Sequence, residues 1–198
     1  MEEKMTRRET KAKILEVAAA LVHLKGFNHT GIQEILLAAG VPKGSFYFYF
    51  KNKEEFGLDL VDHYMQFFML MARTHLEASQ FPPLERLKRF FDAFRVISEE
   101  KECKTGCPIG NIAQEMSGQN EAFRAKLDQA FEKMSDGICR CLEEAQRRGE
   151  VDRKLDPQKT ADFILNSWEG ALVRMKAEKS AEPLKLFSRF VFDRVLPG

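Results

Sequence analysis

Apolar residues recur every three or four positions along most of the chain, the spacing that places them on one face of an α-helix. The first such stripe lies between Thr6 and Lys25, and Gly26 after it predicts the end of that helix. No segment reads as a strand, and the sequence contains no internal repeat or low-complexity tract. The pattern therefore predicts an all-α protein.

The next long stripe begins at about Asn52 and continues to about Gln80, and it is apolar on nearly every side. A helix of this kind must be buried on more than one side. Phe81-Pro82-Pro83 interrupts the pattern, and helical stripes then resume. These stripes predict further helices over about 84–97, 120–148, 157–175 and 183–195, and a short helix that follows the turn at Thr105-Gly-Cys-Pro and ends at about 116. We expect a domain of residues 1–52, with three helices, and a larger helical domain of residues 53–198.

The segment from Thr30 to Phe50 has the signals of a helix, a tight turn and a second short helix. Thr30 is a favourable N-cap, Gly40 can adopt the left-handed conformation that closes a helix, and Pro42 suits the first position of the next. Two helices joined by so short a turn cross steeply, which is helix-turn-helix geometry.

The second of these helices divides into two faces. Phe46, Tyr49 and Phe50 are expected to pack inward, whereas Lys43, Gly44, Tyr47 and Phe48 fall on the outer face. An outer face with two aromatic rings is unusual for a solvated helix but suits the major groove of DNA. There a lysine and a tyrosine hydroxyl can contact phosphates or base edges, and a phenyl ring can contact a thymine methyl group. The alternative is a small three-helix core with an apolar excess.

Charge is unevenly distributed along the chain, although the formal net charge is only +1. Residues 1–53 contain nine Lys and Arg against five Asp and Glu, whereas residues 54–198 contain 22 against 25. A basic N-terminal module on a mildly acidic body is typical of a protein that binds a polyanion through that module. Arg7, Arg8, Lys11 and Lys13 contribute to this excess, either as a phosphate-binding arm or as a solvated helix face.

The stretch GFNHTGIQEILLAAGVPKGSFYFYFKNKEEF resembles the N-terminal signature of the TetR/AcrR family of bacterial transcriptional repressors. Matching positions are Gly26, Phe27, Thr30, Ile35, Ala39, Gly40, Val41, Lys43, Gly44, Tyr47, Tyr49, Phe50, Lys53 and Glu54. Gly31 stands where the family usually has a second Thr that contacts phosphate, and Phe48 stands where His is frequent. The full set of expected DNA contacts is Thr30, Gln33, Lys43, Gly44, Ser45, Tyr47, Phe48, Tyr49 and Lys53.

The resemblance also implies a homodimer on a double-stranded DNA operator. Two heads about 34 Å apart can contact successive major grooves. The last two predicted helices are the expected dimer surface, because Gly170 and Ala171 beside Trp168 permit close helix approach around a large aromatic side chain. The alternative is that this stripe only completes the core of one chain.

The middle helices are rich in aromatic and Met residues, most of which we expect in the core. Some could line a cavity for an apolar or aromatic effector, whose identity the sequence does not specify. The candidate pocket or sensor residues are His63, Tyr64, Phe67, Phe68, Phe94, Cys103, Cys107, Asn111, Phe131 and Trp168.

Among these candidates, Cys107 has the most specific predicted role, that of a reactive thiol. It lies in Thr-Gly-Cys-Pro at an expected helix start, where backbone N–H groups and the helix dipole lower the pKa of a thiol. Cys103 is near enough in sequence to act as a resolving thiol. A Gly-Cys pair here is similar to a TetR subgroup that includes repressors of electrophile-detoxifying reductases. The alternative is an inert buried cysteine.

Other classes of function are less well supported. The sequence contains no Gly-rich phosphate loop, no Gly-x-Ser-x-Gly and no His-Glu-x-x-His, so an enzyme is not expected. Four Cys residues without zinc-type spacing predict reduced thiols, no metal and no cofactor. No apolar run approaches the length of a membrane span, and the N-terminus lacks the apolar region of a signal peptide, so we expect a cytoplasmic protein that does not enter a membrane. A DNA-binding protein without effector control and a thiol-dependent enzyme remain open as alternatives.

Overall fold

The computed structural model describes residues 6–196, which fold into helices with no strand among them. The helices are α1 (Arg7–Lys25), α2 (Ile32–Ala38), α3 (Phe46–Tyr49), α4 (Lys53–Leu76), α5 (Pro83–Glu100), α6 (Pro108–Met116), α7 (Glu121–Arg147), α8 (Pro157–Glu178) and α9 (Glu182–Phe190). A 3₁₀ turn, Lys43–Ser45, precedes α3, and a π-helical turn, Val191–Val195, extends α9. The predicted all-α class is confirmed.

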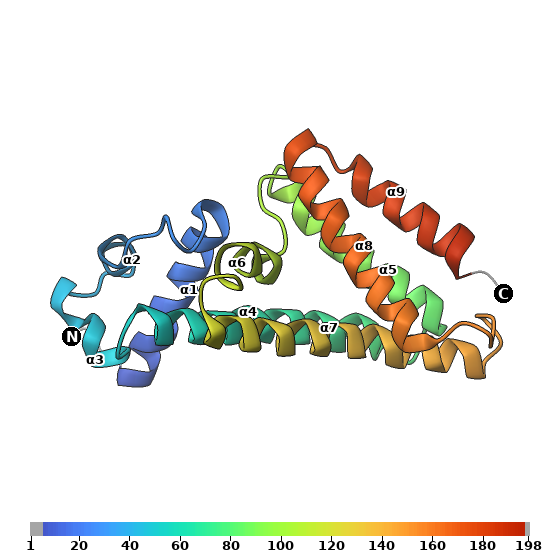
Figure 1. Ribbon diagram of the computed structural model, residues 1–198, viewed down its shortest axis with the longest axis horizontal. Helices are drawn as coiled ribbons and strands as arrows, with labels where there is room; N and C mark the ends of the chain where they lie inside the picture. The colour runs from blue at the N-terminus through green and yellow to red at the C-terminus, as the bar shows by residue number, and fades with distance from the viewer. Residues whose placement is uncertain (1–5, 197–198) are drawn as a thin grey trace.

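Helices α1 to α3 form a small head at one end of an elongated molecule (Figure 1). Helices α4 and α7 pack together along its length, and α5, α8 and α9 lie over their far half. The short helix α6 lies between the head and the α5–α8–α9 layer (Figure 1). With 24 residues, α4 is about 36 Å long, so it joins the head directly to the body.

Capping interactions confirm the predicted starts of several helices. Thr6 and Glu9 form a capping box at the start of α1, and the side chain of Asn120 accepts a hydrogen bond from the backbone N–H of Phe123 at the start of α7. Asp156 caps α8 in the same way. Gly40, with φ of +66°, supplies the left-handed turn expected after α2.

Three details of the prediction are wrong. The N-cap of α2 is Gly31, because the Thr30 hydroxyl donates to the Gly26 carbonyl oxygen at 2.7 Å instead of capping the helix. Pro42 lies before the second helix, which begins as a 3₁₀ turn and contains only four α-helical residues. Helix α4 ends at Leu76, four residues before Gln80.

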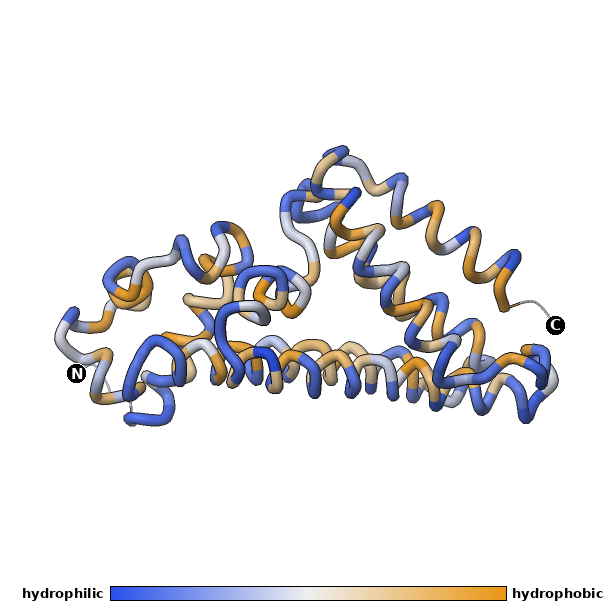
Figure 2. The backbone as a smooth tube through the Cα atoms, in the orientation of Figure 1, coloured by the Kyte–Doolittle hydropathy of each residue, from blue (hydrophilic) through white to orange (hydrophobic). Residues whose placement is uncertain are grey.

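One continuous core joins the head to the body. Figure 2 shows hydrophobic residues along the inner side of α4 and α7, with hydrophilic residues along the outer edge. In the head, the Phe56 ring at the start of α4 contacts Phe46 and Phe50, at centroid distances of 5.8 and 5.1 Å. Phe27 of the head lies 5.3 Å from Phe123 of α7. The first turn of α4 therefore belongs to the core of the head.

Candidate functional site

The turn before α3 and α3 itself present the side chains that were predicted to face outward. Phe46 and Phe50 are buried, whereas Tyr47 and Phe48 are 74% and 58% exposed. Lys43 is exposed as well. Because burying Phe46 and Phe50 holds this short segment on the head, the two exposed rings have a defined direction despite the length of α3.

The other expected contacts on this surface vary in exposure. Within residues 6–196, and apart from its two chain neighbours, nothing lies within 4 Å of the point where a Cβ would sit at Gly44, so another backbone can approach there. Gln33 is exposed on α2, and Tyr49 is half-buried with its ring edge-on to Phe48. The hydroxyl of the half-buried Ser45 donates to the Pro42 carbonyl oxygen at 2.7 Å, so it has one role within the turn already.

Two predicted contacts have structural roles. Thr30 is 1% exposed and holds the turn before α2, so it is not available to DNA. The Lys53 ammonium lies 4.9 Å from the centre of the Phe27 ring, so it also packs on the aromatic core of the head.

Arg7 also lies on this surface, although it was not among the expected DNA contacts. Its guanidinium lies 4.5 Å from the centre of the Phe48 ring and donates to the Phe48 carbonyl oxygen at 2.6 Å. The basic cluster at the start of α1 was a signal for it, but the pairing with Phe48 depends on the tertiary fold, which brings the start of α1 beside that residue. Lys11 of the same cluster pairs with Asp59 of α4 at 2.7 Å, so it joins two helices instead.

A cavity of about 350 Å³ lies in the body, between α1, α4, α5, α6, α7 and α8. A cavity of this size falls within the range of small-molecule sites. Seven of the predicted residues line it: His63, Tyr64, Phe67, Phe68, Phe94, Cys107 and Trp168. Aromatic rings from three different helices therefore converge on one space.

The remaining three predicted residues do not line this cavity. Cys103 is buried in the loop after α5, with a positive φ of 54°. Asn111 lies on α6, where its side-chain oxygen accepts a hydrogen bond from the Lys176 ammonium at 3.1 Å. Phe131 lines a separate acidic groove on α7 with Asp128, Glu132 and Asp162. The role of Cys103 as a resolving thiol gains no support from its position.

The pKa prediction for Cys107 is wrong. Cys107 is the N-cap of α6, and its Sγ accepts a hydrogen bond from the backbone N–H of Gly110 at 3.4 Å, as expected for a helix start. Burial nevertheless raises the pKa of the Cys107 thiol well above its ordinary value, and the nearby Glu169 carboxyl raises it further. The desolvation of the thiolate and the adjacent negative charge outweigh the helix dipole.

Glu169 and His23 are lining residues that the sequence analysis missed. Burial raises the pKa of the Glu169 carboxyl to about 7. Burial lowers the pKa of His23, whose Nε2 lies 2.7 Å from the Gly106 carbonyl oxygen and donates to it. Neither residue belongs to a motif. Glu169 directly follows Trp168 on α8, and only the packing of α8 against α6 brings it to the cavity.

Polar contacts connect the cavity wall to the head. The Tyr64 hydroxyl donates to the Ala19 carbonyl oxygen of α1 at 2.7 Å. On α6, the carboxylate of Glu115 accepts hydrogen bonds from the backbone N–H groups of Phe27 and Asn28 at 3.0 and 2.8 Å. Because α6 starts at the cavity and ends at the head, a displacement of its first turn would reach the loop before α2.

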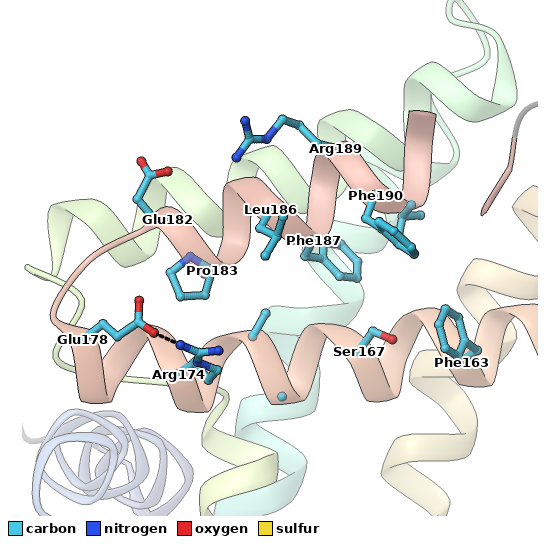
Figure 3. A pocket seen from close by; sticks show the side chains of 13 residues that line it. Phe163, Ser167, Arg174, Glu178, Glu182, Pro183, Leu186, Phe187, Arg189 and Phe190 are labelled. Carbon is cyan, nitrogen blue, oxygen red and sulfur yellow. Dashed lines mark hydrogen bonds and ion pairs between the residues drawn. The ribbon is translucent and has the colours of Figure 1, made fainter. Parts of the chain in front are cut away.

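The outer surface of α8 and α9 contains a second hollow, a groove of about 410 Å³ (Figure 3). Phe163, Leu186 and Phe190 border it and are 51%, 59% and 58% exposed. Gly170 also lines it, as expected for a surface that permits close approach. Trp168 does not, because its ring is buried against Phe91 and Phe187 at 5.0 Å. Trp168 therefore belongs to the core and the cavity rather than to this surface.

A helix-turn-helix head with an outward recognition segment, joined to a helical body with an internal cavity, defines a class of ligand-controlled DNA-binding regulators. Residues 14–59 match the family described as "Bacterial regulatory proteins, tetR family", and residues 83–191 match "Tetracyclin repressor-like, C-terminal domain". The chain belongs to the TetR family, and it is a DNA-binding transcriptional regulator controlled by an effector ligand.

Individual relatives resemble the chain over most of its length. The HTH-type transcriptional repressor DhaR of Mycobacterium sp. (strain GP1) is 35% identical, over 98% of this chain and 96% of DhaR. The transcriptional regulator AcuR of Cereibacter sphaeroides is 39% identical, over 87% of this chain and 80% of AcuR. The crystal structure of a regulatory protein TetR from Rhodobacter sphaeroides superposes with a TM-score of 0.89 at 34% identity, covering 94% of this chain and 98% of that one. No helix within residues 6–196 is long and apolar enough to cross a membrane.

Proposed function

We propose that this chain is a cytoplasmic repressor that binds an operator as a homodimer and leaves it when a small molecule occupies the cavity. Residues 1–52 bind the DNA, and residues 53–198 bind the effector and the partner subunit. The observation that carries the proposal is the outward display of Lys43, Tyr47 and Phe48 on a turn held by a buried aromatic core. The relationship to DhaR, a repressor, favours repression over activation.

In this proposal each part of the recognition surface has a separate role at the DNA. Lys43 and the Tyr47 hydroxyl contact phosphates or base edges, and the Phe48 ring lies against a thymine methyl group. The Gly44 backbone approaches the groove closely because no side chain intervenes. Gln33, Tyr49 and Ser45 lie at the margins of this contact, and Arg7 supports the Phe48 ring from behind.

Dimerisation through α8 and α9 would bring two heads to one operator. The exposed apolar side chains that border the groove in Figure 3 supply a surface of the kind that homodimers bury. Arg174 and Glu178 pair with one another along the rim, which keeps the edge of this surface polar. A single C₂ axis through such a surface pairs α8 and α9 with their own copies.

The two other interpretations are less consistent with the geometry. A thiol-dependent enzyme would need an activated thiolate, whereas burial and Glu169 raise the pKa of Cys107. A DNA-binding protein without effector control would not need a 350 Å³ cavity connected to the head by Glu115. Cys107 lines that cavity, so a reactive effector would meet its thiol there.

The proposal is tested by comparing Lys43→Ala with Lys88→Ala, which removes the same charge from an exposed position on α5. An operator is first selected from the source genome by its retention on the purified protein. Lys43→Ala should weaken operator binding about tenfold and reduce the salt dependence of log K by about two, one phosphate contact for each head. Lys88→Ala should match wild type in a gel-shift titration. Equal behaviour of the two variants, or retention of all genomic fragments alike, would rule the proposal out.

A further inference from the structure

The cavity contains one acidic side chain, and one of its oxygen atoms is unsatisfied. Among the described residues that line the cavity, Glu169 is the only Asp or Glu. Its Oε1 atom is buried and has no hydrogen-bond partner within residues 6–196. Burying a carboxylate without a partner is costly, so such a group usually has a partner in the functional state of the protein.

The fold makes room for this carboxyl group at the first turn of α6. A Cβ atom at Gly110 would collide with Oε2 of Glu169. Glycine inside a helix costs about 1 kcal/mol relative to alanine. Gly110 is buried in the middle of that turn, so its small size serves the close approach of α8 and its carboxyl group rather than a special backbone angle.

The other polar groups of the lining do not neutralise Glu169. The Tyr64 hydroxyl and the His23 Nε2 donate to backbone carbonyl oxygens of Ala19 and Gly106. Burial raises the pKa of the Cys107 thiol, so its side-chain hydrogen bond with Glu169 brings no positive charge to the carboxyl group. Lys101, directly after α5, and His63 of α4 line the cavity, but neither forms an ion pair with Glu169. Most of the remaining lining is apolar and includes aromatic rings from α4, α5 and α8.

We propose, resting on the proposed function, that Glu169 recognises a protonated amine on a small aromatic effector. The ammonium group would lie against Oε1, and the apolar body of the effector would occupy the space between the Phe and Trp168 rings. Aromatic faces attract a cation as well, which favours an amine over a neutral group of the same size. An effector carboxylate would be repelled by Glu169, and an alcohol would satisfy the hydrogen bond but leave the charge unpaired.

Three probes of one size test this inference: 2-phenylethylamine, 2-phenylethanol and phenylacetate. Trp168 is the only tryptophan of the chain and lines the cavity, so quenching of its fluorescence reports binding to the full-length protein without DNA. The amine should bind at least tenfold more tightly than the alcohol at pH 8, and phenylacetate should bind most weakly. An amine that binds no better than the alcohol, or not at all, overturns the inference.

Variants separate charge recognition from general damage to the cavity. Glu169→Gln should abolish the preference for the amine while leaving binding of the alcohol within about twofold, whereas Glu143→Gln, an exposed position on α7, should keep the preference. Gly110→Ala should displace the carboxyl group and weaken amine binding, and Gly118→Ala, where a Cβ would meet nothing within 4 Å, should not. A preference for the amine that survives Glu169→Gln excludes the assignment.

The amine assignment and the repressor function can fail separately, and two results distinguish them. If the alcohol and the amine release the operator equally in a gel-shift titration, the repressor function stands and the amine assignment falls. If no operator is found but fluorescence reports the expected preference, the ligand assignment stands and the repressor function falls.

Discussion

The pKa of Glu169 indicates how much the burial of its carboxylate lowers the free energy of unfolding. Its ordinary value is 4.5 and burial raises it to about 7, so between these values the folded protein holds a proton that the unfolded chain releases. The free energy of unfolding should therefore fall as the pH rises through this window, and the loss should be complete above about pH 7. A ligand site can retain a buried carboxylate that destabilises the folded protein, because ligand binding requires it.

Glu169→Gln should accordingly stabilise the protein, and more so at high pH. The gain over wild type should be about 2 kcal/mol larger at pH 8 than at pH 5, because the buried carboxylate exists only at the higher pH. Urea unfolding at the two pH values and one fixed protein concentration measures it. Glu143→Gln serves as the exposed control. A gain that does not change with pH would mean that Glu169 is solvated or paired.

The role of a residue could be predicted from the sequence where that role depends on local geometry. The outward direction of Tyr47 and Phe48 follows from helical spacing alone, and the structure confirms it. The ionisation of Cys107 could not be predicted in this way. The helix start is local, but the Glu169 carboxyl comes from α8, more than 60 positions away in the chain. The prediction for Thr30 is wrong for a different, local reason, since a hydroxyl at a helix start can cap the helix or close the preceding turn.

At the scale of elements, α6 is the part of the fold that can couple the effector to the DNA. Its N-terminal turn lies against Glu169 and its C-terminal half holds the Phe27 and Asn28 backbone through Glu115. Gly57 allows α4 to contact the head closely as well, because a Cβ there would lie 2.6 Å from the Phe27 ring. Coupling through such an element requires that the two ends move together.

Glu115→Ala should weaken this coupling without emptying either site. The variant leaves two backbone N–H groups of the head without their acceptor, so the effect of the effector on operator affinity should fall severalfold while Trp168 quenching stays unchanged. Gln114→Ala, at the adjacent exposed position, is the control. Full effector-driven release by Glu115→Ala, measured in a gel-shift titration, would show that the signal travels by another route.

The elements themselves were predicted well, but their contacts were not. Thr6, Asn120 and Asp156 act on their own first turns, so their capping roles are visible in the chain order. The junction of α6 with the head joins residues nearly 90 positions apart, so the order of residues along the chain gives no sign of it. Sequence periodicity identifies the face of a helix that is buried but not the helix that covers it.

At the scale of the whole molecule, the surface of α8 and α9 decides whether two heads act together. Leu186 and Phe190 are exposed on α9 beside Phe163 of α8 (Figure 3). Other apolar residues of α9, Leu184 and Phe187, are buried within the chain. The notion of Trp168 as a dimer anchor does not fit its burial against Phe91 and Phe187. The exposed residues of the same two helices take its place in the proposed interface.

Leu186→Glu should convert the proposed dimer to a monomer and abolish tight operator binding, because each head alone makes only half of the contacts. Leu70→Glu, on α4, is a matched control because both leucines are 59% exposed. Light scattering gives the molecular mass, and a gel-shift titration gives the affinity. A Leu186→Glu protein that remains dimeric would place the interface elsewhere.

The sequence by itself determined the all-helical class, the order of the helices and the recognition turn, because periodicity, caps and turn residues act over a few positions. The family resemblance in the first 55 residues belongs to the same local level. Only the tertiary structure decided which side chains line the cavity, which carboxyl group is left unpaired there and which helix joins the cavity to the head. These properties depend on burial and on contacts between distant segments, and the free energies of desolvation and packing that set them exist only once the chain has folded.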